Sequence, residues 1–164
     1  MLKGVKGIHH LAISVPSLDE ARAFYCDVLG FEVAEEFVFG PDNESERVTQ
    51  VRGAAADVML LRAGNVHIEI FEYKHVGVQE QSARRPVCDH GYTHFSLDVD
   101  GDIDEVFDDL ERAGVQWHSP LVGDLDIEGY RVTYGRDPFG NVIEIQKLAT
   151  GNPGHISKLP QWKP

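Results

Sequence analysis

Four residues able to bind a metal occupy matching positions in two similar halves of the chain. His10 and His94 each lie in a segment of alternating apolar and polar residues, GIHHLAISV and GYTHFSLDV. Glu69 and Glu144 each lie between isoleucines, in NVHIEIF and GNVIEIQ. Such alternation predicts strands with one apolar face and one polar face. Imidazoles and carboxylates are ligands of divalent transition metals, so the four positions predict a shared metal site.

Strand alternation selects these side chains over their neighbours. His10 falls on the same face as Ala12 and Ser14, opposite the apolar face that the following helix would cover. His9 falls on the helix-packing face or at the strand edge, which leaves His10 as the candidate ligand. A carboxylate flanked by isoleucines is costly to bury without a partner. A divalent cation between the two glutamates would remove their repulsion and would also bind neutral imidazoles.

The two halves have the same order of elements. Four pairs of equivalent residues are each 84 positions apart (for the first pair, 91 − 7 = 84): Gly7 and Gly91, His10 and His94, Val15 and Val99, Gly30 and Gly114. The closing segments also match, as GNVHIEI and GNVIEI with one residue inserted. A repeat in which each unit is too small to fold alone predicts two modules that pack together.

The elements between the candidate ligands follow from local signals. Ser17 to Glu20 has the form of a capping box, and Asp102 opens a second apolar-striped segment, so each predicts a helix start. Gly30 and Gly114 are placed to end these helices. The remaining expectations are strands at 31–39 and 115–119, hairpins at 57–73 and 128–148 turning at 63–65 and 137–140, a polar loop at 40–46, and a connector at 74–91.

These elements predict an α+β fold of two βαβββ modules that form a cupped mixed sheet around the metal site. The first module spans residues 1–74, the second spans 75–148, and a C-terminal tail spans 149–164. The tail contains Trp162 and is rich in Pro and Gly. It is expected to be disordered, to cover the cup, or to contact a second subunit.

Composition narrows the class of partner. Lys and Arg number 15 and Asp and Glu number 27, so the net charge of −12 argues against nucleic acid binding. No apolar run is long enough to predict a membrane span. The two cysteines, Cys26 and Cys88, predict reduced thiols and a cytoplasmic location. We therefore expect a small-molecule substrate, and a homodimer in which the two modules pair within one chain or across subunits.

Three segments, HHLAISVPSLDEARAFYCDVLGFEV, GYTHFSLDV and DPFGNVIEI, resemble the vicinal oxygen chelate superfamily over about residues 7–148. That superfamily includes glyoxalase I, methylmalonyl-CoA epimerase, extradiol dioxygenases and the bleomycin and fosfomycin resistance proteins. The resemblance implies paired βαβββ modules around a divalent metal, with His10, Glu69, His94 and Glu144 as ligands. The expected ion is Zn, Ni, Co, Fe or Mn.

The resemblance implies a metal-dependent isomerase, epimerase or lyase that removes a proton next to a carbonyl of a chelating substrate. Glu144 or Glu69 would move that proton. Ser14 stands where glyoxalase I has an arginine that contacts glutathione, which argues against lactoylglutathione as substrate. The alternatives are an extradiol-type ring-cleaving dioxygenase, against which the extra carboxylate of Glu69 argues, and a non-catalytic small-molecule-binding protein.

Further side chains are candidates for substrate contact. The paired arginines Arg84 and Arg85 precede the second module and could bind a carboxylate or phosphate. His67 shares the face of Glu69 and could line the cavity. Tyr130 and Tyr134 precede the DPFG turn and could donate hydrogen bonds into the cup, or could serve packing alone.

Overall fold

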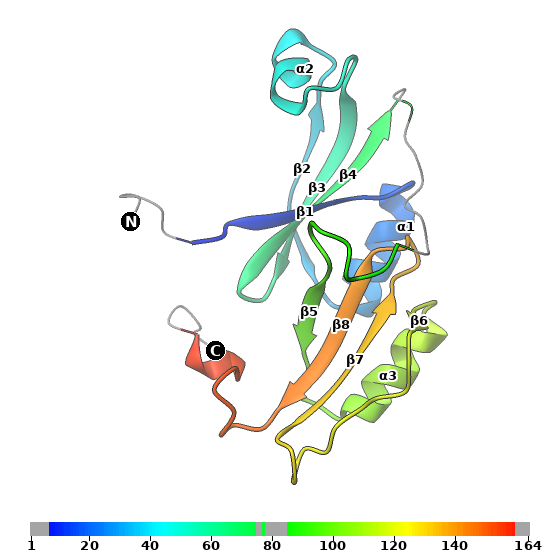
Figure 1. Ribbon diagram of the computed structural model, residues 1–164. Coiled ribbons are helices and arrows are strands. Elements are labelled where there is room, and N and C mark those ends of the chain that lie inside the picture. Colours follow the sequence, from blue (N-terminus) through cyan, green and yellow to red (C-terminus); the bar gives the residue numbers. More distant parts are fainter. Residues whose placement is uncertain (1–6, 75–76, 78–84, 160–164) are drawn as a thin grey trace. The chain divides into compact units, whose positions relative to one another are not determined.

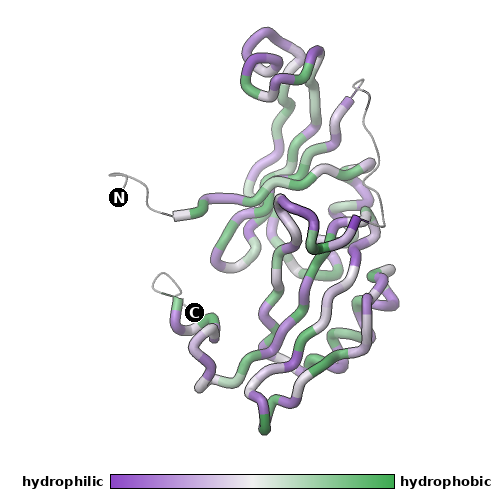
Figure 2. The backbone as a smooth tube through the Cα atoms, in the orientation of Figure 1, coloured by the Kyte–Doolittle hydropathy of each residue, from purple (hydrophilic) through white to green (hydrophobic). Residues whose placement is uncertain are grey.

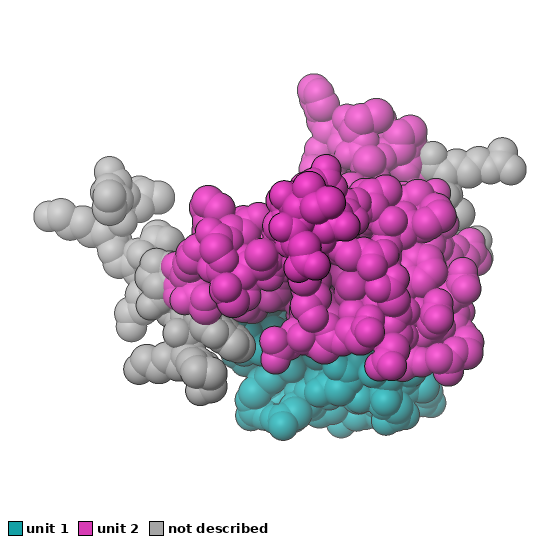
Figure 3. Space-filling view, turned by 90° about the horizontal axis from the view of Figure 1, so that it is seen from below, with its two compact units in different colours: residues 1–79 teal, residues 80–164 magenta. Residues whose placement is uncertain are grey.

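The computed structural model describes residues 7–74, 77 and 85–159. The chain divides into two compact units, residues 1–79 and 80–164, which Figure 3 shows in different colours. Each unit contains one four-stranded mixed sheet (Figure 1). The predicted α+β class with two βαβββ modules is therefore confirmed, and the module boundary stays a prediction.

The first unit has its four strands in the order β1-β4-β3-β2, with β1 parallel to β4 and the other pairs antiparallel. The first strand of the module therefore lies beside the last one. The elements are β1 (His10–Ser14), α1 (Leu18–Arg22), the π-helix η1 (Ala23–Val28), β2 (Glu32–Phe39), α2 (Asn43–Thr49), β3 (Ala55–Ala63) and β4 (Val66–Lys74).

The second unit repeats this topology in the order β5-β8-β7-β6, again with its first and last strands parallel. Figure 2 shows hydrophilic and hydrophobic residues alternating along these strands. The elements are β5 (Phe95–Asp98), α3 (Ile103–Arg112), β6 (Gln116–Trp117), β7 (Tyr130–Arg136), β8 (Val142–Leu148) and the 3₁₀-helix η2 (Ile156–Lys158).

One face of each sheet carries the core of its unit. Ile68 and Ile70 of β4 are buried in the first unit, and Ile143 and Ile145 of β8 are buried in the second. Phe24, on the helical segment after β1, is buried as well. Because successive residues of a strand point to opposite faces, Glu69 and Glu144 lie on the other face of each sheet.

In the second unit, helix α3 is joined to the sheet through an aromatic contact. The rings of Phe107 and Trp117 stack with their centroids 4.9 Å apart, and the Trp117 indole N–H donates to the Phe107 carbonyl at 3.2 Å. Trp117 pairs with Gly135 across β6 and β7. A Cβ at Gly135 would lie 2.5 Å from the Trp117 ring, so only glycine leaves room for this contact.

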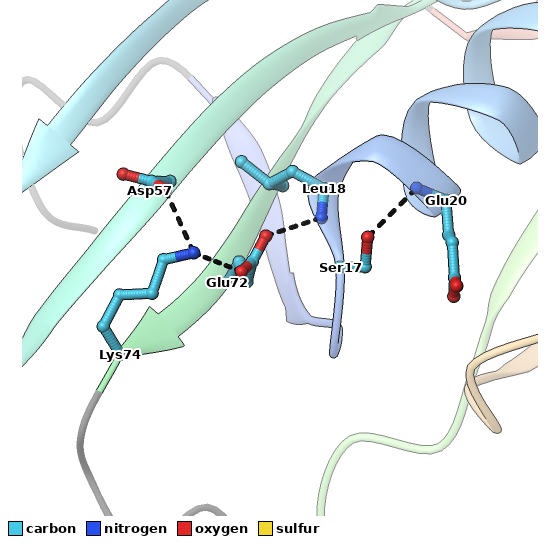
Figure 4. A network of polar contacts seen from close by, with 6 residues as sticks. All are labelled: Ser17, Leu18, Glu20, Asp57, Glu72 and Lys74. Carbon is cyan, nitrogen blue, oxygen red and sulfur yellow. Dashed lines mark hydrogen bonds and ion pairs between the residues drawn. The ribbon is translucent and has the colours of Figure 1, made fainter.

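The start of α1 is stabilised by a glutamate from the last strand of its module (Figure 4). The backbone N–H of Leu18 donates to the Glu72 carboxylate at 2.8 Å, and Ser17 caps the helix through Glu20 N–H. Lys74 forms ion pairs with both Glu72 and Asp57. The hydrogen bonds from Lys74 and from the Leu18 N–H hold the pKa of Glu72 below its ordinary value.

Two local expectations were wrong, the loop at 40–46 and the extent of the strand at 91–99. The expected loop at 40–46 contains the start of α2, whose first turn is capped when the Asp42 side chain accepts from Ser45 N–H at 2.7 Å. The helix expected after Ser17 is present, and its second part, residues 23–28, is a π-helix. The expected strand at 91–99 is shorter, because only Phe95–Asp98 pairs with β8.

We predict that Glu72→Gln lowers the free energy of unfolding by about 1 kcal/mol near neutral pH, because the charge at the start of α1 is lost. The pKa of Glu72 is lower in the folded chain than its ordinary value of 4.5. Its contribution is therefore complete above that value and is lost as the pH falls through the folded pKa. Urea unfolding at several pH values should show the deficit shrinking below about pH 4.5.

The exposed Glu35→Gln is the matched control, since it changes the net charge equally without touching a helix start. A deficit for Glu72→Gln that stays constant down to about pH 3 would contradict the charge-based explanation.

We predict that Gly135→Ala destabilises the chain by about 1–3 kcal/mol, because the added methyl group must displace the Trp117 ring from Phe107. Denaturant unfolding followed by tryptophan fluorescence measures this loss. Gly151→Ala is the control, since no atom lies within 4 Å of its added Cβ. Equal stability of the two variants would show that the Trp117 contact does not constrain position 135.

Candidate metal centre

In the first unit, a histidine and a glutamate face each other from adjacent parallel strands. The Nε2 atom of His10 on β1 lies 3.6 Å from the Oε2 atom of Glu69 on β4. The strand register explains this proximity, because His10 pairs with His67 and Ala12 pairs with Glu69 on the same face. The Glu69 side chain is only 17% exposed, so its carboxylate lies mostly out of water.

The second unit repeats this pair at equivalent positions. The Nε2 atom of His94, just before β5, lies 3.0 Å from the Oε2 atom of Glu144 on β8. Ser96 pairs with Glu144 in the register, which places His94 two residues earlier on the same face. The Glu144 side chain is 13% exposed and that of His94 is 25% exposed.

Each pair has the spacing of two ligands on one cation. Ligand atoms about 2.1 Å from a metal lie about 3.0 Å apart at a right angle and about 3.6 Å apart at 120°. The two observed separations, 3.0 and 3.6 Å, match these values. The donor set of imidazole nitrogen and carboxylate oxygen suits a divalent transition metal. Each His–Glu pair could therefore supply two ligands to such a cation.

Both histidines have a polar neighbour at the other ring nitrogen. The Nδ1 atom of His94 lies 2.9 Å from the Thr93 hydroxyl, and the Nδ1 atom of His10 lies 2.9 Å from Nδ1 of His9. Neither neighbour was a candidate from the sequence. His9 was expected on the helix-packing face or at the strand edge. It lies at the edge of β1, immediately before the strand, with its ring against His10 and stacked on His67 at 5.0 Å.

His67 lies beside the first pair, and its role in lining a cavity stays a prediction. The ring of His67 stacks on His9, and its backbone N–H donates to the His9 carbonyl at 3.2 Å. Farther along the same face, the rings of Phe39, Phe71 and Tyr73 contact one another, with centroid distances of 6.2 and 5.5 Å. Aromatic side chains therefore continue the face that carries His10 and Glu69.

Tyr134 lies beside the second His–Glu pair. Its ring centroid lies 4.6 Å from that of His94, and it pairs with Glu144 in the β7–β8 register. Burial, and secondly the charge of Glu144, raise the pKa of the Tyr134 phenol. Tyr134 therefore lies in the candidate site as a neutral phenol in contact with a proposed ligand.

Two other residues, His118 and Arg136, lie next to β7 and on it. His118 follows β6, and burial together with the neighbouring Arg136 lowers the pKa of its imidazole. The Arg136 guanidinium donates to the carbonyls of Gly140 and Arg85, both at 2.8 Å. Arg136 therefore fixes the turn and the end of the connector. No sequence pattern marks either residue as part of a site.

The remaining substrate candidates lie in different settings. Arg85 donates to the His90 carbonyl at 3.1 Å and lies 3.9 Å from Asp89, so it contacts its own loop. Arg84 lies outside the described residues. Tyr130 shares the face of Tyr134, and its ring packs where a side chain at Gly123 would be. A role in substrate contact stays a prediction for all of these residues.

The described part of the tail forms a folded segment. The Ala149 N–H donates to the Gly129 carbonyl, and Lys158 donates to the carbonyls of Gly151 and Asn152. Burial raises the pKa of Asp98 on β5, and the nearby His155 of the tail opposes this shift. Residues 149–159 are therefore ordered, and Trp162 lies outside the described residues.

Within residues 7–74, 77 and 85–159, no three His, Cys, Asp or Glu side chains group closely enough to hold an ion together. Each unit contributes one His–Glu pair to the candidate centre. Among the same residues, no helix is long and apolar enough to cross a membrane.

The duplicated pair can be compared with known families. Residues 7–145 match the model of the Glyoxalase/Bleomycin resistance protein/Dioxygenase superfamily. The chain belongs to this superfamily. The match includes all four candidate ligands and the whole of both sheets except the last residues of β8. The resemblance drawn from the sequence is thereby confirmed.

Two curated relatives of this superfamily member are each 30% identical to it. A 2-epi-5-epi-valiolone epimerase from an Actinomyces species is matched over 158 residues, which is 93% of this chain and 85% of the relative. The uncharacterized protein YaeR of Escherichia coli is matched over 142 residues, 87% of this chain and 96% of the relative.

Solved structures show the same fold. A glyoxalase family protein from Bacillus cereus is 23% identical, with a TM-score of 0.78, and the match covers 91% of this chain and 99% of the other. The fosfomycin resistance protein FosX from Listeria monocytogenes is 15% identical, with a TM-score of 0.58, over 94% and 99% of the two chains. The superfamily member studied here therefore has a fold of the glyoxalase type.

Proposed function

We propose that this protein is a divalent-metal-dependent epimerase that removes and returns a proton next to the carbonyl of a small α-hydroxyketone. The observation that carries the proposal is the duplicated His–Glu pair, with nitrogen-to-oxygen separations of 3.6 and 3.0 Å on the polar faces of two equivalent sheets. Membership of the superfamily supports an enzyme of the vicinal oxygen chelate type. The epimerase relative supports epimerisation over the other isomerase and lyase reactions.

We propose His10, Glu69, His94 and Glu144 as the ligands of one ion, with the two pairs meeting within one chain or across a homodimer. Two carboxylates balance the charge of a divalent cation, and two neutral imidazoles complete a set suited to Zn, Ni, Co, Fe or Mn. A metal bound there would act as a Lewis acid that polarises the carbonyl of the substrate and makes the adjacent C–H more acidic. A cytoplasmic location and a dimeric state remain predictions.

Glu144 is the proposed base. It is the more buried carboxylate, at 13% exposed, and its charge lies beside His94 and Tyr134. In the proposed step, Glu144 would first swing off the ion. The C–H bond next to the carbonyl would then break, with the proton passing to a Glu144 oxygen and the electron pair moving toward the carbonyl oxygen. Return of a proton to the opposite face of that carbon inverts its configuration. Glu69, the equivalent carboxylate of the other module, would donate that proton after leaving the ion and taking a proton from solvent, and Glu144 would release the abstracted proton to solvent.

The aromatic face of the first unit supports a small organic substrate. Phe39, Phe71 and Tyr73 form a continuous group of rings on the same face as Glu69. Aromatic side chains can pack against the carbon skeleton of a polyhydroxylated ligand, while a few polar groups fix its orientation. The substrate named for the epimerase relative, 2-epi-5-epi-valiolone, is therefore one compound to test with this protein.

We predict that the chain binds one divalent ion, and that Glu69→Gln and Glu144→Gln each weaken its affinity at least tenfold, because each replaces a charged ligand by a neutral amide. Elemental analysis and chelator competition measure the stoichiometry and the affinity. Glu35→Gln, an exposed strand glutamate outside both pairs, is the control. Two ions per chain, or an affinity unchanged by either ligand variant, would contradict a single site made by both modules.

We predict that the metal-loaded protein exchanges the proton next to the carbonyl of an α-hydroxyketone with deuterium from the solvent. Glu144→Gln should lower this rate by about 10²–10⁴-fold, because a neutral amide cannot accept the proton. Proton NMR in D₂O measures the exchange and the appearance of the second epimer. Glu144→Asp keeps the base but moves it, so it should retain more exchange than Glu144→Gln when both variants are compared at saturating metal.

Ring cleavage predicts a different result from the same sample. An extradiol-type enzyme would consume oxygen in the presence of a catechol and would show no solvent exchange with a hydroxyketone. A binding protein would shift the ligand's NMR signals without exchange or turnover. Either outcome would replace the epimerase proposal.

A further inference from the structure

We propose that His9 and Thr93 are positioning residues, which hold the rings of His10 and His94 so that each Nε2 atom is presented to a metal. This inference rests on the proposed function, because it concerns how the proposed ligands are oriented. His9 and Thr93 each immediately precede a candidate ligand, and they occupy equivalent positions of the two modules, 93 − 9 = 84 residues apart.

In both modules, the side chain before the candidate ligand contacts its Nδ1 atom, through a histidine nitrogen in the first module and a threonine hydroxyl in the second. The Thr93 hydroxyl oxygen lies 2.9 Å from Nδ1 of His94, and the Nδ1 atom of His9 lies 2.9 Å from Nδ1 of His10. In each module the Nε2 atom on the far side of the ring faces the glutamate. The side chain preceding each histidine therefore contacts one ring nitrogen, while the carboxylate faces the other.

The protonation of imidazole explains why this contact matters. When Nε2 of a neutral imidazole binds a cation, the proton of the ring is on Nδ1 and needs an acceptor. A threonine hydroxyl oxygen can accept it, and so can the unprotonated Nδ1 of a neutral histidine. Such a bond fixes both the tautomer and the angle of the ring about its Cβ–Cγ bond.

His9 is itself held by the strand that carries Glu69. Its ring stacks on His67 at 5.0 Å with an interplanar angle of 21°, and its carbonyl accepts the His67 backbone N–H at 3.2 Å. The His10 side chain is 42% exposed, so surrounding atoms constrain its ring only on part of its surface. The orientation of His10 therefore depends on His9, whose position is set by β4.

The test is the affinity of the full chain for Zn²⁺, measured by competition with a chromophoric chelator. Thr93→Val and His9→Phe keep the approximate shape of each side chain but remove the acceptor. Each should weaken Zn²⁺ binding by about 10–100-fold. Thr93→Ser and His9→Asn keep an acceptor close to the same place, so they should restore the affinity to within about threefold of the original chain.

Matched controls separate this effect from a general loss of structure. Thr150→Val and His90→Phe make the same chemical changes at exposed positions outside both pairs, and they should leave Zn²⁺ affinity unchanged. Circular dichroism of the metal-free variants should show the same secondary structure. Affinity that is unchanged in Thr93→Val and His9→Phe would overturn the inference. The inference would also be overturned if Thr93→Ser or His9→Asn bound Zn²⁺ as weakly as the variants without an acceptor.

NMR of ¹⁵N-labelled, Zn²⁺-loaded protein gives a readout that does not depend on activity. The Nδ1–H signals of His10 and His94 should be visible in the original chain and lost to exchange with water in the variant without the acceptor. Failure of epimerisation with these results intact would remove the proposed function alone. Normal epimerisation with unchanged affinities would remove the positioning role alone, and a chain that binds no Zn²⁺ would overturn both.

Discussion

The arrangement of both sheets depends on one electrostatic constraint: a carboxylate placed between isoleucines and mostly removed from water needs a partner. Glu69 and Glu144 are 17% and 13% exposed, and each has a histidine nitrogen as a close neighbour on the adjacent strand. A carboxylate mostly removed from water without a partner costs several kcal/mol of folding free energy. The parallel pairing of the first and last strands of each module is what brings the partner into reach.

In each sheet, one face packs against the core and the opposite face carries the His–Glu pair. The isoleucines on either side of each glutamate are buried in the core, so they fix the last strand firmly. The glutamate between them is then held on the opposite face with little freedom to move. In the first unit, Glu72 and Lys74 lie on the core face of β4, and Glu72 stabilises the start of α1 (Figure 4). Rigid strands and well-oriented ligands therefore come from the same alternation of residues.

Much of the fold could be predicted from sequence because its signals are local and occur twice. The capping residues Ser17 and Asp102 and the left-handed glycines Gly30 and Gly114 act where the sequence placed them. Helix α2 could not be found in this way, because its only buried residue is Ser45 and it has no apolar stripe. Neither could the π-helix, which continues the helical spacing of α1 without a distinct sequence signal.

For the candidate site, alternation and the repeat identified the two residues of each pair, since both depend on strand parity. The contacts of His9 and Thr93 could not be predicted, because they depend on ring orientation at the beginning of a strand. The roles of Arg136 and Arg85 were hidden for another reason. Their partners are backbone carbonyls, which every residue possesses and no sequence pattern marks.

The placement of each histidine on the first strand and each glutamate on the last has a consequence for the order of folding. The two members of a pair are 69 − 10 = 59 and 144 − 94 = 50 residues apart, so nearly the whole module must be synthesised and closed before they meet. Contacts between residues so distant in the chain form late, because a long loop must first be ordered. If the proposed metal site is correct, an incomplete module would offer an ion only isolated side chains, and tight binding would require a completed sheet.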